Sequence, residues 1–242
     1  MAKRKFYESK KLMIVVAVTA LAFVMPAAAM VKPLEGAWLK PGERLVCFGD
    51  SITANENYYI KYLRRTLEPL GVEVVNAGRS GDKTPMALTR IRDVADKKPD
   101  AVMIFFGAND SVIGKARWRD EPMVSPEAYR DNLLWIVHYL KGQGVKKFSI
   151  VAPTGCCEGE GLLEFGVSCP PYAEMARVAA DKSDAVLVPL DMVFALEYEK
   201  SAEGAAKLNL TRDGIHFSEK GSRLAADAML KAWNMKSGPN EG

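Results

Sequence analysis

Five short apolar runs rich in Val, Ile and Phe recur along the chain, and they restrict its fold more than any other feature. They do not alternate with polar residues, which is typical of strands buried on both faces. Helical patterns separate the runs, and such alternation favours a parallel sheet with helices on both faces. The predicted strands are Arg44–Phe48, Val72–Asn76, Ala101–Phe106, Lys147–Ala152 and Ala185–Leu190.

Apolar residues at helical spacing predict five helices, several of which carry boundary signals. Gly71 stops the first helix, and Ser125 caps the third with Pro126 in its first turn. Residues 191–212 form a less regular stretch that we expect to be partly helical. The predicted helices are Tyr58–Leu70, Pro85–Asp96, Ser125–Gly142, Pro171–Lys182 and Ser218–Trp233.

The N-terminal segment has the pattern of an export signal. Five basic residues precede an uncharged apolar run, Leu12–Met25, and the small residues up to Ala29 follow it. We interpret residues 1–29 as a signal peptide cleaved after Ala29, so that no membrane span remains; an uncleaved anchor is the alternative, because the length criterion is soft. No Cys comes directly after the run, which argues against a lipid-modified N-terminus. Residues 30–242 are interpreted as a single domain.

Charge and cysteine content narrow the function of the body of the chain. Residues 30–242 carry 28 basic and 29 acidic residues, so there is no electrostatic reason to expect nucleic-acid binding. Cys47 lies in an apolar run and is predicted to be a buried free thiol. Cys169 could pair with Cys156 or Cys157, since export permits disulfides. Their spacing does not match a structural zinc site.

The loops after the strands contain residues suited to acyl transfer. Active sites of parallel sheets lie beyond the carboxyl ends of the strands. Each loop on its own has an ordinary turn composition, but together they supply a nucleophile, oxyanion donors, a base and an orienting acid. The four segments are Gly49-Asp50-Ser51-Ile52-Thr53, Asn76-Ala77-Gly78-Arg79-Ser80-Gly81, Gly107-Ala108-Asn109-Asp110 and Asp213-Gly214-Ile215-His216-Phe217-Ser218.

Within these loops each group has a chemical rationale. Ser51 follows a strand as an exposed nucleophile would, with Ser80 as a rival, although no G-x-S-x-G elbow occurs. The Asn109 carboxamide can donate to a developing oxyanion. His216 lies three residues after Asp213, so that one short turn can place carboxylate and imidazole together. The other histidine, His138, lies inside a predicted helix and is assigned a structural role.

These four segments, in this order, resemble the four blocks of the SGNH or GDSL hydrolase family. The resemblance implies a flavodoxin-like three-layer α/β/α fold with about five parallel strands. It implies Ser51 as nucleophile, His216 as base and then acid, and Asp213 as the residue that orients His216. The oxyanion hole would comprise the backbone N–H groups of Ser51 and Gly78 with the Asn109 side chain.

The family resemblance also bears on the supporting residues and cofactors. Asp50 and Asp110 belong to the motifs, and we expect them to hold loops through hydrogen bonds. No metal or organic cofactor is implied. Because His216 must be neutral to act as base, activity is expected to rise from mildly acidic to neutral pH.

The substrate is expected to be a small or polymeric ester. Trp118 between Arg117 and Arg119 could line a sugar site or meet an acidic group, although a packed Trp in a solvated loop explains it as well. Export excludes most intracellular acyl-CoA substrates, which favours a short-acyl carbohydrate O-acetylesterase. The alternatives are a lysophospholipase or thioesterase, or a glycan-binding module that keeps the fold without turnover.

Overall fold

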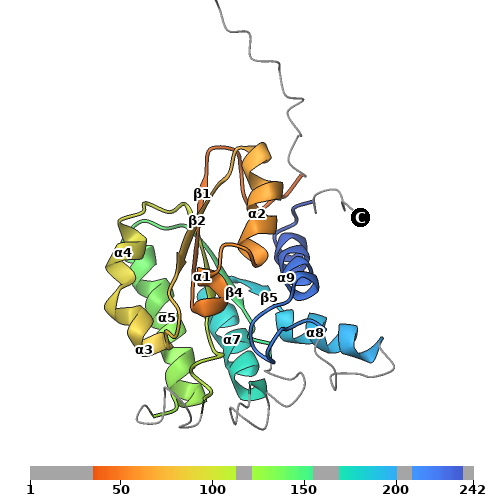
Figure 1. Ribbon diagram of the computed structural model, residues 1–242. Helices are drawn as coiled ribbons and strands as arrows, with labels where there is room; N and C mark the ends of the chain where they lie inside the picture. The colour runs from red at the N-terminus through yellow and green to blue at the C-terminus, as the bar shows by residue number, and fades with distance from the viewer. Residues whose placement is uncertain (1–34, 113–121, 155–168, 201–208, 237–242) are drawn as a thin grey trace, which may run out of the picture. The chain divides into compact units, whose positions relative to one another are not determined.

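The computed structural model describes residues 35–112, 122–154, 169–200 and 209–236 of the 242-residue chain. Five strands in this part form one parallel sheet in the order β2-β1-β3-β4-β5 (Figure 1). This confirms the predicted parallel α/β fold, in the flavodoxin-like strand order. The strands are β1 (Arg44–Gly49), β2 (Glu73–Gly78), β3 (Ala101–Phe105), β4 (Lys147–Val151) and β5 (Val186–Val188).

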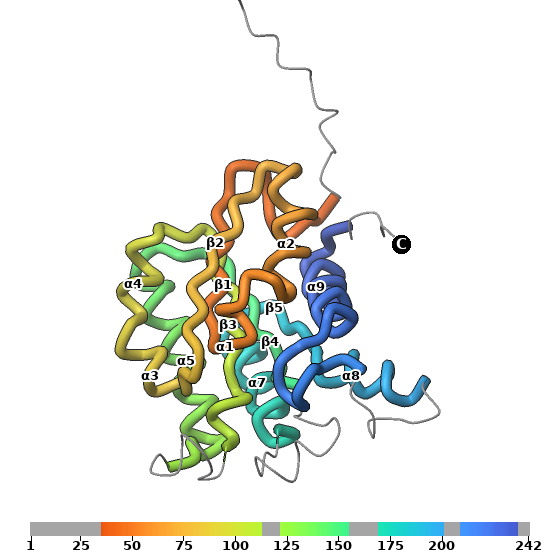
Figure 2. Tube along the Cα trace, viewed as in Figure 1, coloured from red at the N-terminus to blue at the C-terminus, as the bar shows by residue number. Residues whose placement is uncertain are grey.

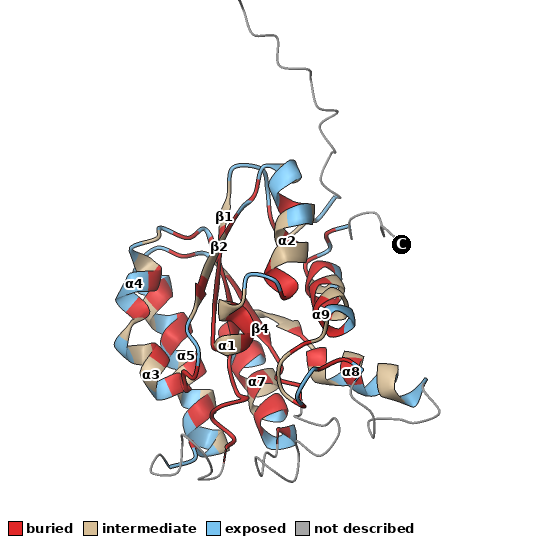
Figure 3. Cartoon of the chain, viewed as in Figure 1, coloured by how far each residue is buried: buried red, intermediate tan, exposed pale blue. Residues whose placement is uncertain are grey.

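Alternate residues of each central strand face opposite helical layers. Leu45 and Cys47 of β1 join one buried apolar cluster, whereas Val46 and Phe48 join the other. Both faces of the sheet are therefore buried, as the uninterrupted apolar runs predict (Figure 3). Helices α2 (Tyr59–Leu67), α8 (Leu190–Glu199) and α9 (Glu219–Ala232) cover the first face, and α3 (Thr84–Thr89), α4 (Ile91–Ala95), α5 (Pro126–Gly142) and α7 (Pro170–Ser183) cover the second.

Two predicted helices differ in extent from the observed ones, for local reasons. Helix α2 ends at Leu67 and continues as the 3₁₀ turn η1 (Glu68–Leu70), because Pro69 has no N–H for the helical ladder. The single helix predicted over Pro85–Asp96 is instead α3 and α4, separated at Arg90, whose φ of −118° is not helical. The stretch that begins at 191 is helical through Glu199.

The strand order brings the ends of three strands to one level. Gly49 at the end of β1 is paired with Gly78 of β2 on one side and with Phe105 of β3 on the other. The chain leaves β1 toward β2 while β3 lies on the opposite side, and such a switch point opens a crevice in open α/β sheets. The tube in Figure 2 also shows α2 and α9 running side by side, which brings residues far apart in sequence to this edge.

Other predicted features have mixed outcomes. Cys47 is a buried free cysteine, as predicted. Cys169 is buried, and its sulfur lies 3.6 Å from Ser111 Oγ. Its predicted disulfide partners, Cys156 and Cys157, lie outside the described residues. His138 lies on the exposed side of α5. None of the described helices is long and apolar enough to cross a membrane.

Candidate active site

The structure brings three of the predicted site residues into a single hydrogen-bonded chain. Ser51 Oγ lies 3.0 Å from His216 Nε2, although the two residues are 165 positions apart. His216 Nδ1 lies 2.7 Å from Asp213 Oδ2. The rival serine, Ser80, is exposed in the neighbouring loop, whereas the imidazole is bonded to Ser51.

Ser51 is held by a short helical turn, α1 (Ser51–Ala54), that starts directly after β1. Asp50 caps this turn, since its Oδ1 accepts the Ile52 N–H at 2.9 Å. The Tyr59 hydroxyl donates to Thr53 Oγ1 at 2.7 Å, and Asn76 Nδ2 donates to the Thr53 carbonyl at 2.8 Å. The turn is therefore fixed from α2 and from β2, and the nucleophile's position does not depend on a free loop.

His216 is presented by a loop closed on itself. Asp213 Oδ1 accepts the N–H groups of Ile215 at 3.0 Å and His216 at 2.7 Å, while Oδ2 contacts the imidazole. The Arg212 N–H donates to the His216 carbonyl at 2.8 Å. Burial raises the pKa of Asp213, but the hydrogen bonds from His216 and Ile215 outweigh it, so the net pKa is lowered. An ionised carboxylate thus faces the ring.

Gly78 departs from the oxyanion role expected of it. Its N–H donates to Asn76 Oδ1 at 2.8 Å and is already engaged. A Cβ at Gly78 would come within 2.2 Å of the Ala54 N atom, so glycine is required here by the close approach of α1. Position 78 therefore requires glycine for packing against α1, and not for an oxyanion contact.

Gly81, three residues further on, has the features that the sequence interpretation assigned to Gly78. It is buried, with a left-handed φ of +82°, and its N–H makes no hydrogen bond within the part of the chain described. The N–H of Ser51 is likewise without a partner there. The buried Asn109 donates from Nδ2 to the carbonyl of Asp82 at 3.0 Å, next to Gly81, and its second amide hydrogen remains. In the sequence, the signal that could have identified Gly81 is its position directly before Asp82 at the end of this loop.

Three buried carboxylates lie behind these loops. Burial raises the pKa of Asp50 to about 7 and that of Asp110 to about 6. Asp110 Oδ1 accepts Thr84 N at 2.8 Å and Thr84 Oγ1 at 2.5 Å, while its Oδ2 has no partner among the described residues. Asp82 is paired with Arg90, whose Nε lies 2.5 Å from Asp82 Oδ2. Asp50 accepts a hydrogen bond from Ile52, and Asp110 accepts hydrogen bonds from Thr84.

The sequence analysis also considered substrate-binding residues and metal ligands. Arg117, Trp118 and Arg119 lie outside the described residues. Within the described ranges, no group of three or more His, Cys, Asp or Glu side chains is arranged to hold a metal ion.

Comparison with known proteins places this chain in a family. The model of the GDSL-like lipase/acylhydrolase family matches residues 47–224. The uncharacterized lipoprotein YqeF of Bacillus subtilis is 33% identical over 114 residues, which are 43% of this chain and 46% of that protein. A GDSL esterase/lipase of Arabidopsis thaliana is 35% identical over 103 residues, 40% of this chain and 42% of that protein. The chain matches less than half the length of these curated relatives.

Solved structures show the same fold at lower sequence identity. An acetylxylan esterase from Geobacillus stearothermophilus has a TM-score of 0.68 and 24% identity, over 84% of this chain and 99% of that one. A putative GDSL-like lipase from Parabacteroides merdae has a TM-score of 0.69 and 20% identity, over 82% and 98%. The family model covers most of the chain and includes Ser51, Asn109 and His216 in its range. The protein therefore belongs to the GDSL-like lipase/acylhydrolase family.

Proposed function

We propose that this protein is a serine ester hydrolase that works through an acyl-Ser51 intermediate. The observation that carries the proposal is the continuous chain from Ser51 Oγ through both nitrogens of His216 to Asp213. Family membership supports the same reaction class. The site stands at the carboxyl ends of β1 and β3, where open α/β sheets bind their ligands.

The proposed reaction has two steps of similar form. Ser51 Oγ attacks the ester carbonyl carbon and passes its proton to His216 Nε2, while the carbonyl oxygen becomes an oxyanion. The intermediate then collapses, the bond to the leaving alcohol breaks, and His216 returns the proton to that alcohol. Water repeats the sequence on the acyl-enzyme and releases the acid. Asp213 stabilises the transient imidazolium.

The oxyanion donors in this proposal are the N–H groups of Ser51 and Gly81 and the Asn109 carboxamide. Gly81 replaces Gly78 because the Gly78 N–H is bonded to Asn76. The contact between Asn109 Nδ2 and the Asp82 carbonyl holds the amide beside the Gly81–Asp82 peptide. Preorganised donors of this kind usually contribute a large part of the rate enhancement in acyl transfer.

For the substrate we propose a short-acyl ester of a carbohydrate. The fold shared with an acetylxylan esterase supports this class. We also propose export through residues 1–29. The Bacillus relative is called a lipoprotein, whereas this chain has no Cys directly after its apolar run. A secreted form that begins at Met30 on N-terminal sequencing supports cleavage, and one that begins near Met1 contradicts it.

The test is hydrolysis of p-nitrophenyl acetate, butyrate and octanoate by the purified protein. Acetate should be preferred, and Ser51→Ala should lower kcat by about 10³-fold or more. Ser80→Ala is the matched control, since Ser80 is an exposed serine of the neighbouring loop, and it should keep wild-type activity.

The other outcomes distinguish the alternatives. Activity that survives Ser51→Ala would overturn the assignment of the nucleophile. A maximum at octanoate would replace the sugar ester with a lipid ester. No reaction with any ester or with a serine-directed phosphonate, alongside glycan binding, would indicate a binding module.

A further inference from the structure

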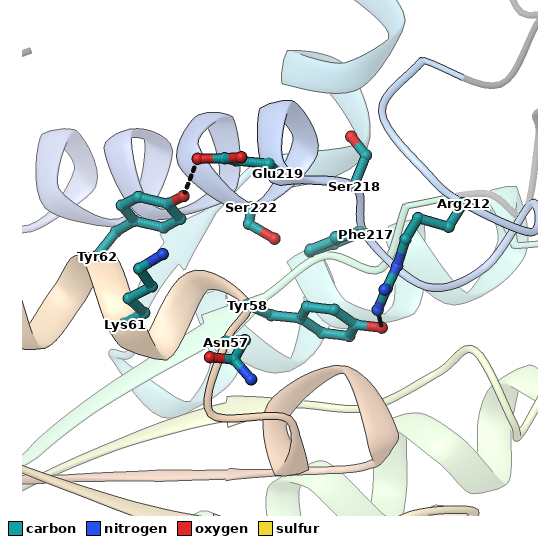
Figure 4. A pocket seen from close by; sticks show the side chains of 9 residues that line it. All are labelled: Asn57, Tyr58, Lys61, Tyr62, Arg212, Phe217, Ser218, Glu219 and Ser222. Carbon is teal, nitrogen blue, oxygen red and sulfur yellow. Dashed lines mark hydrogen bonds between the residues drawn. The ribbon is translucent and has the colours of Figure 1, made fainter. Parts of the chain in front are cut away.

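A surface pocket opens beside the proposed base, between α2 and the start of α9 (Figure 4). Phe217 and Ser218, which line it, directly follow His216 in the chain. The ring of Tyr58, another lining residue, has its centroid 6.4 Å from that of the imidazole. The pocket is thus adjacent to the triad on the His216 side.

This position decides which half of an ester would reach the pocket. In the proposed reaction His216 Nε2 must protonate the leaving alcohol, so the alcohol oxygen approaches the imidazole. The carbonyl oxygen instead faces the donors around Asn109 and Gly81. The alcohol portion of the substrate therefore extends along the His216 side, toward the pocket.

Two cations, Lys61 and Arg212, line the wall of the pocket. Among the described residues, no carboxylate lies within ion-pair distance of Lys61 or Arg212. The Arg212 guanidinium stacks on the Tyr58 ring at 5.0 Å and donates to the Tyr58 hydroxyl, which leaves other N–H groups of its fork available. Lys61 Nζ lies 5.4 Å from the Tyr62 ring centroid.

A buried hydroxyl provides a third unused donor. Ser222 on α9 is fully buried and lines the pocket, and its Oγ has no hydrogen-bond partner in the described structure. Buried polar groups without partners are rare, and a ligand is one explanation for them. Figure 4 places Lys61 beside the Tyr62 ring, Ser222 between the two tyrosine rings and Arg212 at the Tyr58 end.

One carboxylate oxygen in the pocket lining is occupied by neighbouring donors. Glu219 is the one acidic residue in its lining, and its Oε1 accepts from the Tyr62 hydroxyl at 3.1 Å and from Arg223 Nη2 at 3.1 Å. Three side-chain cations lie within 6 Å of the Tyr62 ring centroid. What the pocket offers a ligand is therefore charge-assisted donors from Lys61 and Arg212 together with the Ser222 hydroxyl.

We infer that this pocket binds an anionic group, a carboxylate or a phosphate, carried on the alcohol portion of the ester. Hydrogen bonds between a cation and an anionic oxygen are about twice as strong as neutral ones, whereas a neutral sugar would offer both cations only neutral acceptors. The inference rests on the proposed function and narrows it to esters of acidic alcohols. An acetylated acidic polysaccharide and a glycerophosphate ester both carry this chemistry.

Two matched substrate pairs test the inference on the full-length protein. The first is an O-acetylated trigalacturonate against its neutral methyl ester, and the second is acetylglycerol 3-phosphate against acetylglycerol. The anionic member of at least one pair should have the higher kcat/KM, and the pair with the larger ratio identifies the carboxylate or the phosphate as the source. The preference should shrink in high salt. Equal kcat/KM within both pairs would overturn the inference.

Variants locate the preference in the pocket. In the double variant Lys61→Gln with Arg212→Gln, the ratio of anionic to neutral kcat/KM should fall about tenfold. The charge-preserving pair Lys61→Arg with Arg212→Lys should retain most of it. The matched control removes the same charges elsewhere, as Lys146→Gln with Arg92→Gln, both exposed. A ratio that is unchanged in the first variant, or lowered equally in the control, contradicts the pocket assignment.

A binding measurement separates this inference from the proposed function. In Ser51→Ala, calorimetry with trigalacturonate and with glycerol 3-phosphate should give a measurable Kd for one of them, which weakens at least tenfold when Lys61 and Arg212 are both changed to Gln. This readout needs no turnover. If no ester is hydrolysed but this binding is found, the proposed function fails and the anion pocket stands. If esters are hydrolysed but neither anion binds, only the pocket fails.

Discussion

The imidazole of His216 is held between two oxygens of unlike charge. Asp213 Oδ2 lies 2.7 Å from Nδ1, and Ser51 Oγ lies 3.0 Å from Nε2. Because the pKa of Asp213 is lowered, this carboxylate is ionised at neutral pH and accepts the Nδ1 proton. The lone pair of Nε2 is then directed at Ser51, which is the tautomer that a general base requires.

Asp213→Asn tests this arrangement. The Asn Oδ1 can still accept the N–H groups of Ile215 and His216, so the loop should keep its shape. Its NH₂ group would face Nδ1 and favour the wrong tautomer, so kcat for p-nitrophenyl acetate should fall by roughly 10²- to 10⁴-fold. KM should change little. A variant with wild-type kcat would show that Asp213 shapes the loop without assisting His216.

Asp110, a buried carboxyl group behind the site, lowers the free energy of unfolding at neutral pH. Asp110 is almost completely buried, its pKa is raised to about 6 by burial, and its Oδ2 lacks a partner in the described structure. The folded protein therefore binds a proton more tightly than the unfolded chain does. By linkage, the free energy of unfolding falls as the pH rises from about 4 to about 6.

Asp110→Asn should remove this part of the pH dependence. The Asn Oδ1 can keep both hydrogen bonds from Thr84, and the amide does not ionise. A shift of this size corresponds to roughly 3 kcal/mol. Urea unfolding should be measured at pH 4.5 and pH 7.5. The free energy of unfolding of the variant, relative to that of the wild type, should be higher at pH 7.5 than at pH 4.5. Parallel pH profiles for the two proteins would contradict the assignment. Asp50, with its pKa raised to about 7, remains in both.

At the scale of elements, the break between α3 and α4 ties the second layer to the strand ends. Arg90 at the break donates to the carbonyls of Ala77 at 2.8 Å and Gly49 at 3.0 Å, and it pairs with Asp82. Its guanidinium also lies 4.6 Å from the Phe48 ring centroid. One side chain thus joins β1, β2 and the loop that holds Gly81. The apolar spacing of 85–96 predicts one helix because it carries no trace of these distant acceptors.

Arg90→Met should destabilise the fold by about 3 kcal/mol, because it leaves the buried Asp82 without its main partner. Chemical denaturation measures the change, and Asp82→Asn added to Arg90→Met should recover part of it. Arg92→Met, on the exposed side of α4, is the control and should stay within about 0.5 kcal/mol of the wild type. An equal effect from both single variants would contradict this role of Arg90.

At the scale of the whole molecule, two apolar clusters flank one sheet, and β1 passes through its centre. Cys47 on β1 has no exposed surface, and burial raises the pKa of its thiol well above the usual range. The helices that cover this face of the sheet, α2, α8 and α9, must separate from it before a reagent can reach this sulfur. Its reactivity should therefore report on the opening of the whole fold.

Native-state alkylation followed by peptide mapping tests this prediction. The rate of Cys47 modification should increase with urea concentration as steeply as global unfolding does. The free energy of opening calculated from this rate should equal the free energy of unfolding from chemical denaturation. Modification at a rate independent of urea would show instead that the helical layer over Cys47 opens locally.

The sequence by itself determined what depends on neighbours along the chain. The buried strands follow from uninterrupted apolar runs, the start of α5 follows from Ser125 and Pro126, and the contact between Asp213 and His216 follows from a spacing of three residues. Each of these is decided within a few residues, where local geometry leaves few choices. The motif blocks also predicted which loops would gather, since parallel strands end at one edge.

Only the tertiary structure decided which groups in those loops are available. The Gly78 N–H is bonded to Asn76, and Gly78 itself packs against α1. The Gly81 N–H, in contrast, has no partner among the described residues. Likewise, the pocket beside His216 is lined by Lys61 of α2, by Arg212 and by Ser222 of α9. These contacts form when helices distant in sequence pack against one sheet. The direction of a donor and the pairing of a charge depend on that packing, which no local pattern encodes.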